Sequence, residues 1–339
     1  MGAWSELLPE DRLVCQNRWR RAIERRLWQI LIKHDIGDDS PVDPWFGVPA
    51  LFDVKPSNRW GVEVTHQASE TEGGAWGYDP PLKTEADFDR LRLPTFTYNA
   101  NATQSRLDRV HELLGDILPV RLTCGPPLSA TLGTAAADLR GLTQIMIDMA
   151  AEPEWMHRLM AYLRDANLHA MEQVKATGLL TPNNLGPMTC SDPIGEPNDD
   201  GSLGYGNMWC MANSQEFQGV GPAMWRAFCL EYQRPIIEQF GLSGYGCCEN
   251  LTKKIDILRQ IPNLRRKLGI VFQDFRLLFH KKVFDNVAIV LEVQGVPRKE
   301  IRRRVFSALR MVNLHIKMWE YPSHLSYGEQ QRVAIARAV

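Results

Sequence analysis

The feature that most constrains the fold is the alternation of short apolar segments with long segments of helical periodicity. Residues 119–127 begin as an apolar strand and stop at a Gly-Pro loop, and two long helical segments follow at residues 135–149 and 153–177. Apolar residues spaced three and four apart predict helices, whereas short apolar runs bounded by glycine and proline predict buried strands. Strands that alternate with helices of this length are typical of a parallel sheet. We therefore predict an α/β fold.

The segment at residues 244–250 is the first candidate for chemistry. It follows a helical segment at residues 222–240 and a glycine break. We expect it at the C-terminal end of a strand, where α/β proteins place their functional residues. Cys247, Cys248 and Glu249 supply two thiols and a carboxylate, a set that can bind a soft metal such as zinc. The alternative is that one cysteine packs as a small hydrophobic residue and the other has no role.

Other polar residues at the ends of predicted strands or in loops are candidate members of a pocket: His66, Asp192 and Glu216. Side chains at such positions can meet at one edge of a parallel sheet. A purely structural role is the alternative for each of them. His66 and Glu216 complete the predicted catalytic set with Cys247 and Glu249.

Charge divides the chain near residue 265. Residues 1–265 carry 25 basic and 34 acidic residues, whereas residues 266–339 carry 14 basic and 6 acidic residues. The net charges are −9 and +8, and a shift of this size indicates a domain boundary. The basic part lacks the interleaved aromatic residues of a nucleic-acid surface, and the three arginines at 302–304 indicate a solvated helix face. We therefore expect no nucleic-acid partner.

Cysteine usage and hydropathy predict the compartment. The seven cysteines form an odd set without regular spacing, which indicates a reducing compartment rather than a disulfide framework. Charged residues interrupt the N-terminal segment, so it does not have the pattern of a signal peptide. No apolar run approaches the length of a membrane span. The expectation is a cytoplasmic protein.

Several stretches within residues 1–265 resemble the uroporphyrinogen decarboxylase superfamily, which also includes corrinoid-dependent methyltransferases. The matching stretches are RGLTQ at 140–144, PEWMH at 153–157, QVKATG at 173–178, GPAMWRAF at 221–228, Tyr232 and PII at 235–237. The resemblance implies a TIM (β/α)8 barrel. Residues 1–265 cover about six of its eight strands, so the predicted domain is a truncated barrel.

This resemblance also implies a chemistry. In methyltransferase members, a His-x-Cys metal motif stands where this chain has residues 244–250. Cys247 matches that cysteine, and Tyr245 occupies the histidine position. Zinc in these relatives activates a thiol as a thiolate that accepts a methyl group, because a metal lowers the pKa of a thiol. Cys247 and Cys248 would be the metal ligands here.

A second implication concerns the substrate. True decarboxylases carry an arginine-rich segment for the substrate carboxylates, and residues 44–54 contain no arginine. The implied function is therefore methyl transfer rather than decarboxylation. The methyl group would move to or from a thiol or a corrinoid, and the corrinoid would be carried by a partner protein. The substrate would be a small molecule.

Two stretches near the C-terminus resemble ABC-transporter ATPases, most closely the cell-division branch of that family. The stretch LGIVFQDFRLL at 268–278 is similar to a strand and Q-loop, and LSYGEQQRVAIARA at 325–338 is similar to the signature motif and its helix. Tyr327 replaces the first glycine of that motif. The resemblance implies a helical subdomain between the two stretches and a membrane-embedded partner subunit. It also implies a remnant ATP site formed by four residues: Gln273, Ser326, Gly328 and Gln330.

The two resemblances leave three interpretations of the chain. The first is an enzyme of the decarboxylase superfamily impaired by truncation, and the second is an ATP-binding fragment of a cell-division ABC transporter. The third is a chimera with neither activity, produced by fusion or by a sequence-assembly artefact near residues 263–266. A barrel cut at this point exposes an open edge. We therefore expect residues 268–272 to pair, parallel, beside the strand that enters Cys247.

The 339-residue chain is predicted not to hydrolyse ATP by itself. Its sequence contains no G-x-x-x-x-G-K-S/T motif, the loop whose backbone N–H groups and lysine hold the nucleotide phosphates. Phosphoryl transfer depends almost entirely on such positioning and charge stabilisation. Phosphate release from Mg-ATP should stay at background, measured beside a Ser326→Ala control. Turnover that the wild type shows and the control lacks would contradict the prediction.

Overall fold

The computed structural model describes residues 4–36, 42–67, 77–184, 194–198, 201–247, 249–264, 277–293 and 296–338. The chain divides into two compact units, Met1–Arg265 and Arg266–Val339. The change in net charge falls at the same position. Each unit buries its own hydrophobic residues, so each is described by itself.

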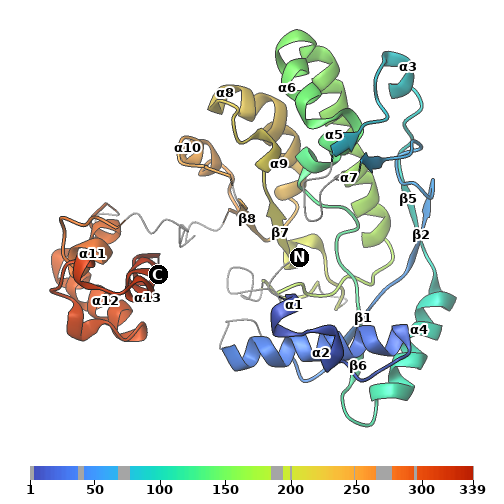
Figure 1. Cartoon of the computed structure of the whole chain (residues 1–339). Helices are drawn as coiled ribbons and strands as arrows, with labels where there is room; N and C mark the ends of the chain where they lie inside the picture. Colours follow the sequence, from blue (N-terminus) through green and yellow to red (C-terminus); the bar gives the residue numbers. More distant parts are fainter. Residues whose placement is uncertain are drawn as a thin grey trace. The chain divides into compact units, whose positions relative to one another are not determined.

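The N-terminal unit combines short strands with helices of very different lengths (Figure 1). Its strands are β1 (Phe46–Pro49), β2 (Phe52–Lys55), β3 (Thr65–Gln67), β4 (Gly77–Asp79), β5 (Thr95–Tyr98), β6 (Val120–Thr123), β7 (Trp209–Ala212) and β8 (Leu242–Tyr245). Its α-helices are α1 (Trp4–Leu7), α2 (Arg18–Ile36), α3 (Glu85–Phe88), α4 (Ala100–Leu114), α5 (Leu132–Arg140), α6 (Leu142–Ala151), α7 (Pro153–Lys175), α8 (Pro222–Trp225), α9 (Glu231–Ile237) and α10 (Ile255–Leu258). Short 3-10 turns lie at Glu10–Arg12, Tyr205–Asn207 and Gln215–Phe217.

The described strands form two parallel and two antiparallel pairs. β1 pairs with β6 and β7 pairs with β8, both in parallel, and each of these pairs is joined by a segment that contains helices. β2 pairs with β5 and β3 pairs with β4, both antiparallel. The parallel pairs agree with the α/β prediction, because parallel neighbours require a crossover connection.

Hydrogen bonds outside the strands join the two parallel pairs into one series. Directly after β6, the backbone N–H of Cys124 donates to Thr181 Oγ1, and the backbone N–H of Thr181 donates to the Cys124 carbonyl, both at 2.9 Å. The Asn183 side chain then accepts from the backbone N–H of Trp209 at 2.7 Å and donates to its carbonyl at 2.8 Å. On the other side of β8, Leu264 forms an isolated parallel bridge with Ser243.

The series runs β1, β6, residues 181–183, β7, β8 and Leu264, which is the order of these segments along the chain. The eight-stranded barrel stays a prediction, because the described pairings do not close on themselves. Residues 268–272, predicted to pair beside β8, lie outside the described residues. Leu264 is the described residue that occupies this position next to β8.

Helix α7 runs through the core of the N-terminal unit. Pro153 begins it at the position where a missing N–H has no helical partner to lose. Its apolar stripe is buried along the whole length, with Met156, Leu159 and Val174 fully inaccessible to solvent. Burying such a side chain contributes about 1.5–3 kcal/mol relative to leaving it exposed. The α7 stripe is therefore a main source of stability for this unit.

A buried ion pair joins the two helices that precede α7. Arg140 at the end of α5 donates to Asp148 of α6, with distances of 2.7 and 3.2 Å, and Asp148 is fully buried. The guanidinium also donates to the Leu82 carbonyl and lies 4.2 Å from the ring centroid of Trp155. The carboxylate accepts a further hydrogen bond from Gln144 at 2.7 Å. These partners satisfy a charge that would otherwise be costly to bury.

Two predicted helices are interrupted in the structure. The segment predicted as one helix at 135–149 divides into α5 and α6 at Gly141, whose φ of 89° favours glycine and ends a right-handed helix. The segment predicted at 222–240 contains a π-helical stretch, Arg226–Leu230, just before Pro235 within α9. Proline has no N–H to donate to the preceding turn, and a wider π turn is one way to accommodate that loss.

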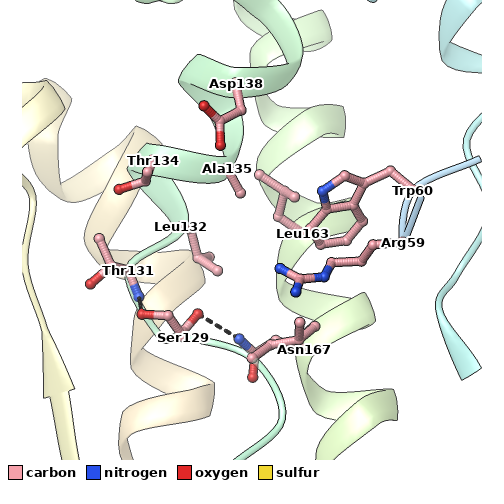
Figure 2. Close-up of a pocket in the computed structure, with 11 residues that line it drawn as sticks. Arg59, Trp60, Ser129, Thr131, Leu132, Thr134, Ala135, Asp138, Leu163 and Asn167 are labelled. Atoms are coloured by element: carbon pink, nitrogen blue, oxygen red, sulfur yellow. Dashed lines mark hydrogen bonds between the residues drawn. The ribbon is translucent and has the colours of Figure 1, made fainter. Parts of the chain in front are cut away.

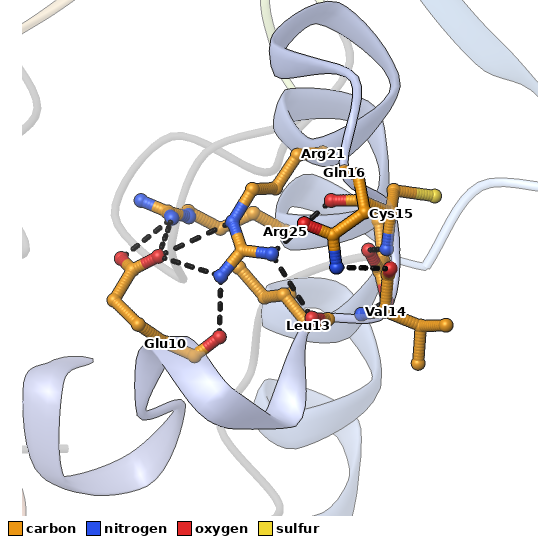
Figure 3. Close-up of polar contacts among 8 residues, drawn as sticks. Glu10, Leu13, Val14, Cys15, Gln16, Arg21 and Arg25 are labelled. Carbon is orange, nitrogen blue, oxygen red and sulfur yellow. Dashed lines mark hydrogen bonds and ion pairs between the residues drawn. The ribbon is translucent and has the colours of Figure 1, made fainter.

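Helix α2 begins at Arg18, and two of its arginines bind the segment that precedes it. Arg21 and Arg25 bind the Glu10 carboxylate with Nη2–oxygen distances of 3.1 and 2.6 Å (Figure 3). Arg21 also donates to the carbonyls of Leu13 and Cys15 at 3.0 and 3.1 Å. Arg21 and Arg25 thus fix the segment that precedes α2.

The C-terminal unit is a cluster of helices: α11 (Val283–Val293), α12 (Arg298–Met311) and α13 (Tyr327–Ala338), with 3-10 turns at His315–Lys317 and Pro322–His324. Val287, Leu309 and Val333, one from each helix, are buried in its core. The fully buried Asn286 side chain donates to three backbone carbonyls, which fixes the turn into α11. Among the described residues, no helix combines the length and the apolar character needed to cross a membrane.

Gly241, just before β8, is predicted to tolerate no side chain. A Cβ atom there would collide with the Gly206 carbonyl oxygen and with Cγ2 of Ile194, whereas a Cβ atom at Gly219 would contact nothing. Gly241→Ala should lower the free energy of unfolding of the N-terminal unit by about 1–3 kcal/mol, the usual cost of overpacking. Urea denaturation followed by tryptophan fluorescence measures this change. Gly219→Ala is the matched control, and equal stability of the two variants would refute the prediction.

Candidate functional site

Glu249 is buried beyond the C-terminal ends of β7 and β8, with both carboxylate oxygens in use. One oxygen accepts from the backbone N–H of Ser214 at 2.8 Å and lies 3.4 Å from the Ser214 hydroxyl. The other oxygen accepts from the backbone N–H of Cys247 at 2.8 Å. Only 8% of the residue is exposed. Glu249 therefore ties the loop after β8 to the loop after β7.

Of the two zinc ligands expected from the resemblance, the structure describes Cys247, and the zinc site stays a prediction. Cys247 is exposed, and the Glu249 oxygens already accept backbone hydrogen bonds. Tyr245, in the expected histidine position, is buried and donates its hydroxyl to Gln233 Oε1 at 2.6 Å. Among the described residues, no three His, Cys, Asp or Glu side chains come together as metal ligands. Cys248 lies outside the described residues.

Lys254 is a buried cation near these strand ends that the sequence did not reveal. It is 2% exposed, and its Nζ donates to the Phe217 carbonyl at 3.0 Å and lies 5.0 Å from the ring centroid of Trp225. Burial lowers the pKa of Lys254, while the neighbouring Cys229 and Glu249 act in the opposite direction. Its position five residues after Glu249 is the only signal of it in the sequence.

The segment that follows β7 connects Glu249 with the start of α5. The backbone N–H of Asn213 donates to Thr131 Oγ1 at 3.2 Å, and the next residue, Ser214, binds Glu249. Glu216 accepts from the Thr134 hydroxyl at 2.7 Å, and its other carboxylate oxygen is buried with no hydrogen-bond donor among the described residues. The short loop at residues 213–216 thus contacts both Glu249 and the first turn of α5.

A cavity of about 160 Å³ lies beside α5, with Thr134 and Asp138 in its wall (Figure 2), and His66 and Glu216 contact these two lining residues. A ring nitrogen of His66 lies 3.1 Å from Asp138 Oδ1, and Asp138 and Thr134 line the cavity. Glu216 reaches the same wall through Thr134. The structure therefore relates His66 and Glu216 to one cavity, whereas Cys247 and Glu249 do not line it. Asp192 lies outside the described residues.

In the C-terminal unit, Ser326 begins α13 with a reciprocal pair of hydrogen bonds. The backbone N–H of Ser326 donates to Glu329 Oε2 at 2.9 Å, and the backbone N–H of Glu329 donates to Ser326 Oγ at 3.3 Å. This arrangement is a capping box, which satisfies N–H groups at a helix start. A hydrogen bond from Lys317 and the N–H of Ser326 lower the pKa of Glu329 to about 2. The helix start is therefore fixed at neutral pH.

The other predicted nucleotide-binding residues differ in accessibility. A Cβ atom built on Gly328 would contact nothing within 4 Å, so the backbone there is open to approach. Gln330 instead donates to the carbonyls of Pro322 and Leu325, both at 3.1 Å, and this side chain holds the turn before α13. Gln273 lies outside the described residues.

Comparison with known proteins relates the C-terminal part of the chain to ABC transporters. Residues 248–339 match the family model described as ABC transporter. The methionine import ATP-binding protein MetN of Francisella tularensis is 47% identical over 91 residues, which cover 27% of this chain and 25% of the relative. The cell division ATP-binding protein FtsE is 49% identical over 108 residues in Streptococcus pneumoniae and 53% identical over 81 residues in Escherichia coli.

These matches are partial on both sides. The two FtsE alignments cover 32% and 24% of this chain and 45% and 36% of the relatives, so the chain spans less than half of each curated relative. A solved dimeric bacterial ABC transporter cassette is 38% identical to this chain, with a TM-score of 0.21. The match covers 22% of this chain and 33% of the cassette chain. The decarboxylase resemblance of the N-terminal part stays a prediction.

The family match begins earlier than the sequence analysis placed it. It starts at residue 248, whereas the change in composition lies near residue 265. Residues in this overlap pack with the N-terminal unit, since Leu258 and Ile261 are buried in its core and Lys254 binds the Phe217 carbonyl. The boundary of the family match and the boundary of the compact units are therefore different.

Glu249 is predicted to contribute to stability by joining two loops. Glu249→Ala removes the acceptor of the buried Ser214 N–H and of the part-buried Cys247 N–H, and a buried N–H left unsatisfied costs about 1–3 kcal/mol. The variant should have a lower free energy of unfolding in urea. Glu112→Ala, at an exposed position of α4, is the matched control and should stay within about 0.5 kcal/mol of the wild type. Indistinguishable unfolding curves for the two variants would exclude this role.

Proposed function

We propose that the C-terminal unit forms the signature-motif side of an ABC-transporter nucleotide site that an intact ATPase subunit completes. The observation that carries the proposal is the capped and accessible start of α13, where Ser326 and Gly328 lie. The matched relatives are described as ATP-binding proteins, which supports nucleotide as the ligand.

The start of α13 has the physical properties that bind a phosphate group. The N-terminus of a helix carries partial positive charge and N–H groups, so it favours anions. The Ser326 oxygen accepts from the Glu329 N–H, which leaves the hydroxyl hydrogen available to donate to a phosphate oxygen. The absence of a side chain at Gly328 lets a phosphate approach the backbone.

Exposed apolar residues of the C-terminal unit support a protein partner. Phe279 is 56% exposed, Trp319 is 53% exposed and Ile316 is 78% exposed. The Trp319 ring stacks on Phe284 with centroids 5.1 Å apart, which holds the exposed ring in place. Single exposed apolar side chains are common, and a contiguous patch of them marks an interaction surface. The proposed partner is a membrane-embedded transporter subunit, contacted from the cytoplasmic side.

A second candidate function belongs to the N-terminal unit, where polar side chains gather beyond the ends of parallel strands. Glu216, Glu249 and Lys254 are all at this edge, and Glu216 adjoins the cavity through Thr134. This arrangement supports a small-molecule enzyme of barrel type, because such folds bind substrates at the C-terminal ends of their strands. Methyl transfer involving a corrinoid protein stays a prediction from the resemblance.

Complementation of a disabled ATPase tests the proposal for the C-terminal unit. An FtsE-type ATPase with an intact phosphate loop and a disabled signature motif should regain Mg-ATP turnover when the 339-residue chain is added. Ser326→Ala should lower the restored turnover by about tenfold or more, because it removes a hydrogen-bond donor at the transferred phosphate. Ser307→Ala, at an exposed position of α12, is the matched control and should restore turnover like the wild type.

Two results would overturn the proposal. One is a failure of the wild-type chain to restore any turnover. The other is equal stimulation by the wild type and by Ser326→Ala. Circular dichroism of each variant ensures that the C-terminal helices are still folded.

A further inference from the structure

We propose that Lys317 is a positioning residue of the nucleotide site: it neutralises the Glu329 carboxylate, so that the start of α13 can accept a phosphate group. This role rests on the nucleotide function proposed above and adds the residue that controls the charge of the site. Two observations carry it. One is the series of contacts from Lys317 through Glu329 to Ser326, and the other is the presence of an acidic side chain where an anion is expected to bind.

Glu329 places a negative charge in the first turn of α13. Its Oε2 atom accepts a hydrogen bond from the backbone N–H of Ser326 at 2.9 Å, and its own backbone N–H donates to Ser326 Oγ at 3.3 Å. The carboxylate is therefore held beside the residue whose hydroxyl is proposed to donate to a phosphate oxygen. Because like charges repel one another, an uncompensated carboxylate here would weaken the binding of a phosphate group.

Lys317 supplies the opposite charge. Its Nζ atom lies 2.6 Å from Glu329 Oε1, the carboxylate oxygen that the Ser326 N–H does not use. The side chain of Glu329 is 17% exposed and that of Lys317 is 39% exposed, so water screens this ion pair only in part. The hydrogen bond from Lys317 is the main cause that lowers the pKa of Glu329 to about 2. Glu329 is therefore charged at neutral pH, and the pair as a whole is neutral.

The turn that carries Lys317 is fixed to the core of the C-terminal unit. The Lys317 N–H donates to the Leu314 carbonyl at 3.0 Å, and Leu314 is 1% exposed. The next residue of the turn, Met318, accepts through its carbonyl from the N–H of Phe284 in α11 at 2.8 Å. Because the backbone is held on both sides of Lys317, only the lysine side chain has to be ordered to reach Glu329.

A role in stability alone would have a different experimental signature. Loss of a merely structural contact reduces the amount of folded chain, and this lowers the maximal turnover without changing the ATP concentration that gives half-maximal turnover. Loss of charge compensation acts on the binding of a negatively charged ligand. It therefore raises the ATP concentration that gives half-maximal turnover.

The test uses the 339-residue chain with an FtsE-type ATPase whose signature motif is disabled, and it measures restored turnover against Mg-ATP concentration. Lys317→Met should raise the ATP concentration for half-maximal turnover by about fivefold or more, because the unpaired carboxylate repels the phosphate groups. Lys317→Arg keeps the charge and should stay within about twofold of the wild type. Lys299→Met, at an exposed position of α12, is the matched control and should behave like the wild type.

A double variant shows whether the charge of Glu329 is responsible. Glu329→Gln removes the negative charge and keeps a side-chain oxygen that can accept from the Ser326 N–H. Combined with Lys317→Met, it should return the ATP concentration for half-maximal turnover to the value of the wild type. A double variant that needs as much ATP as Lys317→Met alone would contradict the proposed role.

The remaining outcomes separate this role from the proposed function. If the wild-type chain restores no turnover, the proposed function fails and the role of Lys317 fails with it. If the wild type restores turnover and Lys317→Met needs no more ATP than Lys299→Met, only the role of Lys317 is overturned. Circular dichroism checks the folding of each variant. Should Lys317→Met unfold, Glu329→Gln alone decides, since it should lower the ATP requirement and a higher requirement would overturn the role.

Discussion

The N-terminal unit depends on a single side chain that replaces a strand pairing. Asn183 accepts from the backbone N–H of Trp209 and donates to its carbonyl, so one amide group supplies both bonds of a ladder position. On one side of this contact lie β1 and β6, and on the other lie β7 and β8. The loops that follow β6 and β7 are also joined directly, because the Asn213 N–H donates to Thr131 Oγ1 at 3.2 Å.

The polar residues near these strand ends fall into two groups: those held by structural partners and those that line the cavity beside α5. Glu249 uses both oxygens to hold loop backbone, and Tyr245 uses its hydroxyl within the core. These groups are occupied by structural partners. The cavity beside α5 has a mixed lining, with Ser129 and Asp138 among its polar residues and Leu132 and Leu163 among its apolar ones. A mixed lining of this kind is typical of small-molecule sites.

In the C-terminal unit, by contrast, the geometry of the candidate site depends on residues that are neighbours in the sequence. Ser326 and Glu329, three residues apart, form a capping box from neighbouring residues alone. This stretch lies within residues 248–339, which match the ABC transporter family model. A helix start of this kind is fixed by nearby residues. It therefore keeps its geometry in a chain whose match covers less than half of each curated relative.

The sequence by itself determined features that depend on near neighbours: the long helix α7, the charge boundary near residue 265 and the ABC-like segment at the C-terminus. It did not reveal the division of helix 135–149 at Gly141, because one glycine is compatible with either outcome. It also did not reveal the roles of Asn167 and Lys254. These roles depend on contacts between residues far apart in the chain, such as Asn167 with Ser129 and Lys254 with Phe217. Only the tertiary structure decides which polar groups find partners on burial, because those partners come from distant parts of the chain.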